Sequence, residues 1–84
     1  MIRNIYALRD SVAMKYRDLV CDDSPEEAKR NLAFQVNNNS QFAFFAKDLT
    51  FLKVGEFDLE TGVITPLVPA DVICHVVDLI GEKG

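Results

Sequence analysis

DDSPEEAKRNLAFQV, residues 22–36, is the stretch that decides the fold. Ser24 can accept a hydrogen bond from the first turn of a helix, and the fixed backbone angle of Pro25 fits that turn. Glu27 stands three residues after Ser24, which is the spacing of a capping box. The stretch therefore predicts a helix that begins just after Ser24.

The same stretch also predicts which side of this helix is buried. Ala28, Leu32 and Val36 recur every four residues, so they form one apolar stripe, and Phe34 points away from it. Residues 37–40 read NNNS, and asparagine tolerates the backbone conformations in which helices end. We expect the helix to end there and to pack its stripe against other elements.

The segment before this helix has the period of β-structure. Residues 2–8 alternate between two faces, and a second alternation follows in residues 12–17. Asp10 and Ser11 lie between the two segments, and their side chains can bond to nearby backbone in a turn. The segment predicts a β-hairpin.

The segment after the helix predicts a second hairpin. Residues 41–49 are apolar without a clear period, and we expect a loop or a short helical turn there. Residues 50–57 have strand chemistry, Gly62 can adopt the positive φ of a turn, and residues 63–65 supply the return strand. Phe57 and Ile64 are then expected to be cross-strand partners.

Pro66 and Pro69 are expected to close the return strand, and a last helix is expected to open at residues 68–71 and to run to Gly81. Its polar edge is narrow, so we expect its wide apolar arc to form a homodimer interface. The arc consists of Val72, Ile73, Val76, Val77 and Ile80. The predicted fold class is therefore α+β: a small single domain over residues 1–84, in the order ββαββα, with an antiparallel sheet and the helices packed on one face.

Composition and motifs exclude several classes of function. The chain carries a net charge of −4, which on average repels nucleic acid, and it contains no run long enough to span a membrane. Cys21 and Cys74 lack the spacing of a zinc site, so no metal and no cofactor are expected. His75 and Asp78 could pair on the last helix, but no nucleophile or second ligand converges on them, so we expect no enzyme.

The basic and aromatic residues of the first predicted hairpin are the one group that indicates a binding site. On the first hairpin, Arg3, Lys15 and Arg17 are expected to project from the face opposite Tyr6, Met14 and Tyr16, with Arg9 near the turn. Cations beside aromatic rings are how several folds hold single-stranded nucleic acid, with the cations on phosphates and the rings under bases. We take Arg3, Arg9, Lys15, Tyr16 and Arg17 as candidate DNA-binding residues; the alternative is an ordinary solvated strand face.

Most of the chain resembles the small non-structural protein of gokushoviruses, the tailless single-stranded-DNA phages of the Microviridae. The resemblance is carried by YALRD at residues 6–10, by the helix over residues 28–37, and above all by VGEFDLETGVI at residues 54–64. It departs from the family pattern at Leu49 and at residues 46–47.

This resemblance implies a non-enzymatic, DNA-binding protein in the cytoplasm of the infected bacterium. Such a protein is absent from the mature capsid and is thought to act when replication switches to packaging of single strands. The expected partners are therefore single-stranded DNA, a second copy of the chain, and a phage capsid or replication protein. The alternative is a homodimeric module that docks on phage or host replication or capsid proteins without touching DNA.

Overall fold

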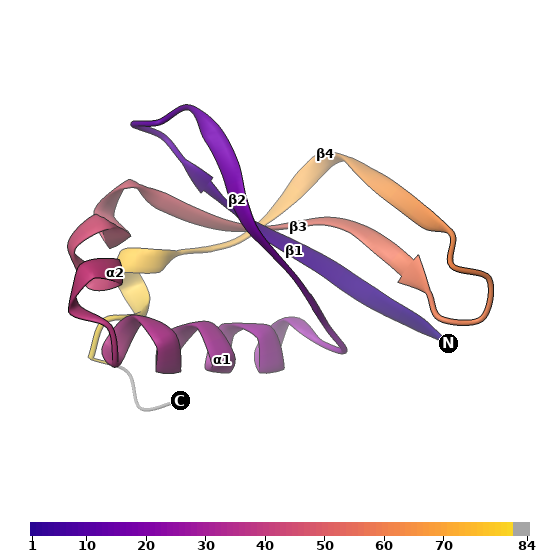
Figure 1. Cartoon of the computed structure of the whole chain (residues 1–84), viewed down its shortest axis with the longest axis horizontal. Helices are drawn as coiled ribbons and strands as arrows, with labels where there is room; N and C mark the ends of the chain where they lie inside the picture. The colour runs from indigo at the N-terminus through magenta and orange to yellow at the C-terminus, as the bar shows by residue number, and fades with distance from the viewer. Residues whose placement is uncertain (82–84) are drawn as a thin grey trace.

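The computed structural model describes residues 1–81, in which two hairpins are separated by helices (Figure 1). The elements are β1 (Ile2–Asp10), β2 (Lys15–Asp22), α1 (Pro25–Asn37), α2 (Ser40–Phe45), the 3-10 turn η1 (Ala46–Asp48), β3 (Leu49–Asp58), β4 (Ile64–His75) and the 3-10 turn η2 (Val76–Leu79). The strands form one antiparallel sheet in the order β2-β1-β3-β4. β1 and β3 are therefore its central strands, and β2 and β4 are its edges.

The predicted first hairpin is present, but its second strand begins later than the expected residues 12–17: residues 11–14 form the turn, and β2 runs from Lys15 to Asp22. The hairpin also has one irregularity. Register shifts between Tyr6 and Leu8, because β2 inserts an extra residue where Asp18 has a positive φ of 56°. On the turn side of this bulge, Arg9 pairs with Tyr16 and Leu8 pairs with Arg17. Since directly opposed residues point to the same side of a sheet, Tyr16 and Arg17 lie on opposite faces.

The helix predicted after Ser24 is confirmed as α1. The Ser24 hydroxyl accepts the backbone N–H of Glu27 at 3.2 Å, and Pro25 opens the first turn. The predicted stripe of Ala28, Leu32 and Val36 is buried, while Phe34 is exposed. The following apolar run is the short helix α2, which the sequence left open between a loop and a helical turn.

The predicted second hairpin is present, and Phe57 pairs with Ile64 as expected. Gly62 has a φ of +77°, the conformation for which the turn requires a glycine. The return strand does not close at Pro66, however. β4 continues to His75, because residues 67–70 leave the ladder opposite Val54 and pairing then resumes.

The predicted last helix, from residues 68–71 to Gly81, is wrong. Val72 pairs with Leu52 and Cys74 pairs with Phe51, so these residues continue the sheet. Only η2 is helical within that range, and the order of the main elements is ββαββ instead of ββαββα. The β-branched Val72 and Ile73 favour a strand, and proline is tolerated on edge strands and at bulges.

The main core lies between α1 and one face of the sheet. Tyr6, Leu8 and Phe51 from the central strands form a single buried cluster with the α1 stripe, and the rings of Tyr6 and Phe51 stack with centroids 5.2 Å apart. Asn4 Nδ2 donates a hydrogen bond to the Tyr6 hydroxyl at 3.0 Å. Burial raises the pKa of Tyr6 above its ordinary value, because the ionised form would lose its contact with water.

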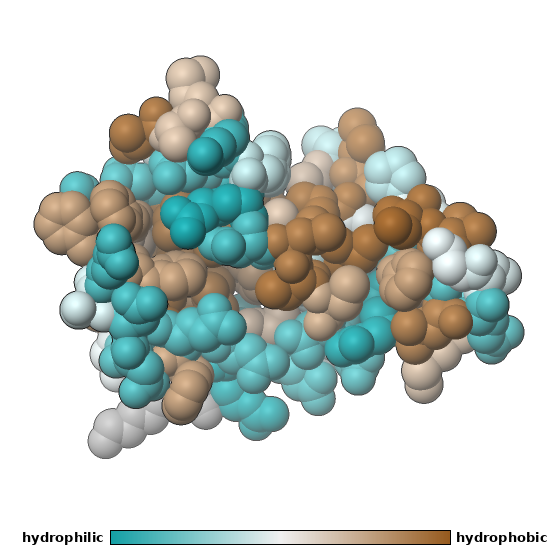
Figure 2. Space-filling model, viewed as in Figure 1, coloured by the Kyte–Doolittle hydropathy of each residue, from teal (hydrophilic) through white to brown (hydrophobic). Residues whose placement is uncertain are grey.

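The other face of the sheet lacks such a cover over its middle. A groove there is lined only by residues of the four strands: Ala7, Tyr16, Leu19, Val54, Pro66, Leu67, Val68 and Ala70. Figure 2 shows hydrophobic side chains gathered over the half of the molecule that leads to the β3–β4 turn. Figure 1 shows the helices gathered towards the other end.

Candidate nucleic-acid interface

The turn between β1 and β2 is fixed by hydrogen bonds on two sides. Asp10 Oδ1 accepts the backbone N–H groups of Val12 and Ala13, each at 3.0 Å. The bond from Ala13 is the largest cause that lowers the pKa of Asp10. Ser11 donates its backbone N–H at 2.9 Å and its hydroxyl at 3.2 Å to the carbonyl oxygen of Asp48 in η1. The end of the hairpin is therefore attached to the segment that follows α2.

One cation–ring pair lies on the face of the hairpin that carries Tyr16. The Arg9 guanidinium carbon is 5.2 Å from the centroid of the Tyr16 ring, and the ring is more than half exposed. A guanidinium in this position stabilises the ring by a cation–π interaction. The exposed part of the Tyr16 ring can contact a flat ligand while Arg9 remains close to the ligand's charge.

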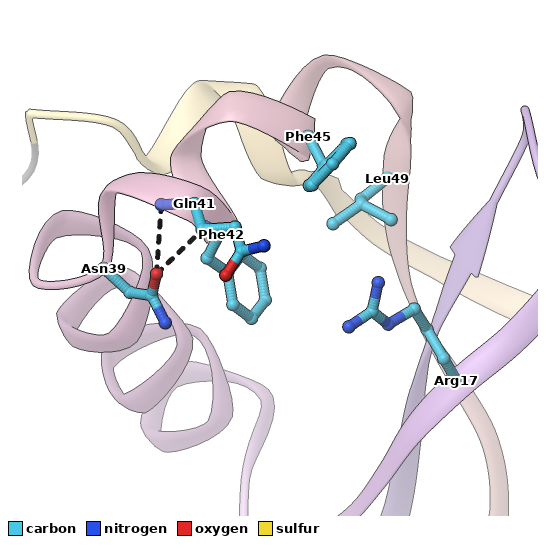
Figure 3. Close-up of a pocket in the computed structure, with 6 residues that line it drawn as sticks. All are labelled: Arg17, Asn39, Gln41, Phe42, Phe45 and Leu49. Atoms are coloured by element: carbon cyan, nitrogen blue, oxygen red, sulfur yellow. Dashed lines mark hydrogen bonds between the residues drawn. The ribbon is translucent and has the colours of Figure 1, made fainter.

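Arg17 points from the other face of the hairpin into a pocket of about 250 Å³ (Figure 3). Phe42 and Phe45 of α2 and Leu49 of β3 supply its apolar wall, and Asn39 and Gln41 supply amide groups. Arg17 Nε is bonded to Asp18 Oδ2 at 2.8 Å. Such a surface ion pair stabilises by only about 0–1 kcal/mol, so a phosphate can compete for the guanidinium.

α2 provides the aromatic half of this pocket, and its own start is capped. Asn39 Oδ1 accepts the backbone N–H groups of Gln41 at 3.0 Å and Phe42 at 3.1 Å, as Figure 3 shows. No residue of α2 is fully buried, although Phe42 packs against the main core. The cap therefore fixes a short exposed helix whose rings remain accessible.

A second cation–ring pair follows directly along the chain. Lys47 Nζ is 5.7 Å from the centroid of the Phe44 ring, and that ring contacts Phe45 edge to face at 5.2 Å. Phe44 is 71% exposed. The sequence analysis did not predict these aromatic residues as part of a site, because residues 41–49 show no hydrophobic period. The signal that could have identified them is a lysine three residues after Phe44, which is the spacing that brings a cation beside a ring on a helical turn.

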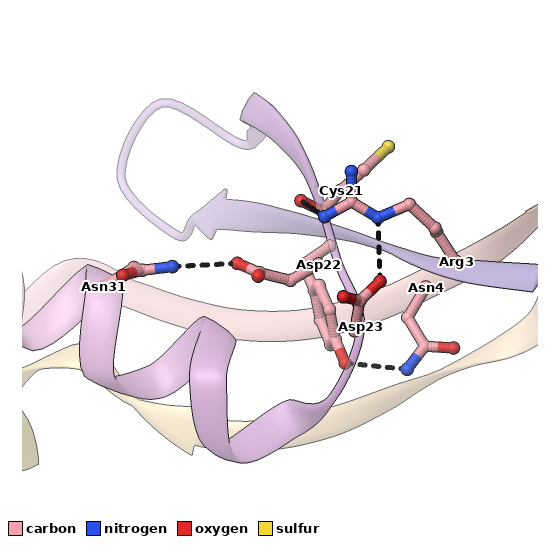
Figure 4. A network of polar contacts seen from close by, with 7 residues as sticks. Arg3, Asn4, Cys21, Asp22, Asp23 and Asn31 are labelled. Atoms are coloured by element: carbon pink, nitrogen blue, oxygen red, sulfur yellow. Dashed lines mark hydrogen bonds and ion pairs between the residues drawn. The ribbon is translucent and has the colours of Figure 1, made fainter.

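Arg3 does not join this site. It lies six residues from Arg9 along β1, roughly 20 Å away. Its Nε bonds to Asp23 Oδ1 at 3.0 Å and its Nη2 donates to the carbonyl oxygen of Cys21 at 3.3 Å (Figure 4). The expected single face of Arg3, Lys15 and Arg17 is therefore corrected: Arg3 supports the connection into α1.

Basic residues are more frequent at the hairpin end than in the chain as a whole. Arg9, Lys15, Arg17 and Lys47 make up four of the nine basic residues and belong to the hairpin end or to the segment bonded to it. Figure 1 places the β3–β4 turn at the opposite end, where Asp58 and Glu60 lie. Asp10, Asp18 and Asp48 lie in the same part, so its basic residues exceed its acidic ones by one, although the whole chain carries a charge of −4. We use the name hairpin end for Arg9, Lys15, Tyr16, Arg17, Phe44, Phe45 and Lys47.

The residues expected to form a dimer arc do not share one surface. Val76 is fully buried in the core, and Ile73 is half-buried against it. Val72 lies on β4, while Val77 and Ile80 lie in and after η2. The arc is corrected for the same reason as the helix that was to carry it, and His75 and Asp78 likewise share no helical edge.

Comparison with known proteins identifies one family. A family model described as Phage ORF5 protein matches residues 3–79 of the chain. No curated protein and no solved structure matches it. Within residues 1–81, no helix is long and apolar enough to cross a membrane, and no cluster of three or more His, Cys, Asp or Glu side chains could hold a metal ion.

Proposed function

The chain belongs to the phage ORF5 protein family, and we propose that it is a non-enzymatic protein that binds single-stranded DNA through its hairpin end. The observation that carries the proposal is the presence of three exposed aromatic rings at one end of the molecule, two of them with a cation beside them. Arg9 lies by Tyr16 and Lys47 lies by Phe44, while Phe45 lines the pocket that Arg17 also lines. Unstacked bases lie on such rings while the cations hold the phosphates.

The chemistry of the pocket supports a single strand over a duplex. Stacking on an aromatic side chain contributes about 1–3 kcal/mol per base, and it requires a base whose face is free. The amides of Asn39 and Gln41 line the same pocket and can bond to a base edge. A duplex hides its base faces and offers only its phosphates to this surface.

The proposed biological role follows from the same substrate. The resemblance to gokushovirus non-structural proteins supports a protein that acts in the cytoplasm of the infected bacterium, when genome replication gives way to packaging. The acidic remainder of the molecule fits that role, because it limits binding to the hairpin end and so keeps the strand releasable. Weak, salt-sensitive binding is therefore expected.

Fluorescence anisotropy with a labelled single-stranded oligonucleotide tests the proposal. Each phosphate contact on a single strand adds about 0.7 to the slope of log affinity against log salt, so four contacts give a slope of about −3. Duplex of the same length should bind more weakly. Failure of the wild-type protein to bind the single strand at low salt would contradict the proposed function.

A charge-reversal pair locates the site. In Lys15→Glu/Arg17→Glu the affinity should fall at least about tenfold, because two charged contacts are lost. Lys29→Glu/Arg30→Glu on α1 makes the same change in net charge away from the hairpin end, and it should weaken binding far less. Equal losses in the two variants would show that net charge alone governs binding and would remove the hairpin end from the account.

A further inference from the structure

The strongest feature that DNA binding leaves unexplained is the apolar groove on the uncovered face of the sheet. It has a volume of about 420 Å³, and no charged side chain lines it. A groove without a cation has nothing to offer a phosphate backbone. Its occupant must present apolar side chains.

The two walls of the groove come from the two edges of the sheet. Tyr16 and Leu19 of β2 form one wall, and Ala7 and Val54 lie in the middle. The other wall belongs to β4 and consists of Pro66, Leu67, Val68 and Ala70. Leu19 is 68% exposed. An exposed apolar trough of this kind is unusual on a protein that has no partner.

The β4 wall also carries a projection. Residues 67–70 have no partner in the ladder, because Gly55 pairs with Pro66 and Lys53 pairs with Asp71. Val68, within this bulge, is 85% exposed. The same face therefore offers both a hollow and an apolar projection.

We propose that this face is the interface of a symmetric homodimer, in which Val68 of each copy enters the groove of the other. A two-fold axis requires each copy to present the same patch, and a projection beside a groove satisfies that requirement with one patch. An uncharged contact also suits two molecules that each carry a charge of −4, because their carboxylates stay outside it.

A stable interface buries about 800 Å² per partner, so the contact has to extend beyond the groove along the sheet. The molecule measures 38 Å along its longest axis, and the strands run broadly along that axis. Pairing of two β4 edges is a poorer alternative, since Pro66 and Pro69 remove N–H donors from that edge.

Sedimentation equilibrium of the full chain without DNA tests the dimer. The wild-type protein should show twice the monomer mass as its concentration rises. Val68→Asp and Leu19→Asp should each raise the dimer dissociation constant about 100-fold, because each would bury a carboxylate without a partner. Both side chains are exposed in the monomer, so circular dichroism should show an unchanged fold.

Val12→Asp is the matched control. Val12 is 74% exposed, but it lies in the β1–β2 turn and does not line the groove. This variant should dimerise like the wild type. A wild-type protein that is monomeric at every concentration overturns the proposal, and so does a dimer that survives both groove substitutions. Tyr16 belongs both to the groove and to the hairpin end, but Val68 and Leu19 belong to the groove alone. Because the sedimentation is done without DNA, the two proposals still fail separately.

Discussion

Two aspartates define the two hairpin turns at the scale of single residues. Asp10 accepts N–H groups from Val12 and Ala13, and Asp58 accepts those of Glu60 at 2.9 Å and Thr61 at 3.4 Å. The bond from Glu60 is the largest cause that lowers the pKa of Asp58, as the bond from Ala13 does for Asp10. Both turns were predictable, because aspartate in front of a turn has a specific chemical use.

The lowered pKa of Asp10 predicts a loss of stability in acid. A carboxyl whose pKa is lower in the folded state stabilises it fully above the unfolded value of about 4, and the stabilisation disappears as pH falls through the folded value. Asp10→Asn keeps an acceptor oxygen but cannot titrate. Its urea midpoint should therefore fall less steeply than that of the wild type below about pH 4.

Asp10→Ala separates the acceptor from the charge. It should unfold at lower urea than the wild type at neutral pH, where Asp10→Asn should stay close to the wild type. If Asp10→Asn lost stability in acid as steeply as the wild-type protein, the hydrogen-bonded carboxylate would not be the titrating group.

At the scale of elements, the sequence predicts structure that depends on neighbouring residues better than structure that depends on pairing with a distant strand. The cap at Ser24 and the stripe of α1 could be predicted, because the residues that form each of them are separated by only three or four positions in the sequence. β4 could not, because the bulge at residues 67–70 interrupts its alternation and two prolines imitate the end of a strand. Residues 71–75 form a strand because they pair with β3, and the sequence of residues 71–75 alone gives no information about that pairing.

α2 is the element whose loss should separate binding from folding. Asn39→Ala removes the acceptor of two N–H bonds, which costs about 1 kcal/mol of helix stability. The affinity for single-stranded DNA should fall about fivefold, while the urea midpoint changes little, because α2 buries no complete side chain.

Hydrogen exchange of the amides of residues 41–45 should be faster in the same variant. Asn39→Ser retains a capping oxygen and should restore slow exchange and affinity together. An Asn39→Ala protein with rapid exchange but full affinity would exclude the α2 rings from DNA binding.

At the scale of the whole molecule, the sequence indicated the fold class but not the surfaces. The predicted basic residues Arg9, Lys15 and Arg17 lie near one another on two faces of the hairpin, because Arg9 pairs with Tyr16 while Lys15 and Arg17 lie on either side of it in β2. Their aromatic neighbours come from α2, and that proximity depends on the attachment of Ser11 to Asp48. A charge pattern along one strand could not predict it.

Dimerisation through the open sheet face predicts a melting temperature that depends on concentration. A partner that binds only the folded chain stabilises it by mass action, so the melting temperature of the wild type should rise as protein concentration rises. Val68→Asp should melt at a temperature independent of concentration, and Val12→Asp should follow the wild type. Wild-type melting that ignores concentration would contradict a dimer coupled to folding.

The central position of β1 and β3 sets the time at which the domain can form during synthesis. Their register joins Ile2 to Asp58 and Asp10 to Leu49, so the middle of the sheet unites distant parts of the chain. The ribosome must release β3 before β1 can pair with it. Until then, Tyr6 and Leu8 of β1 cannot pack against Phe51 of β3 in the core. Such distant pairing makes folding slow and exposes a nascent chain to non-native contacts. The first hairpin is exposed in this way for the longest time, because it is synthesised first.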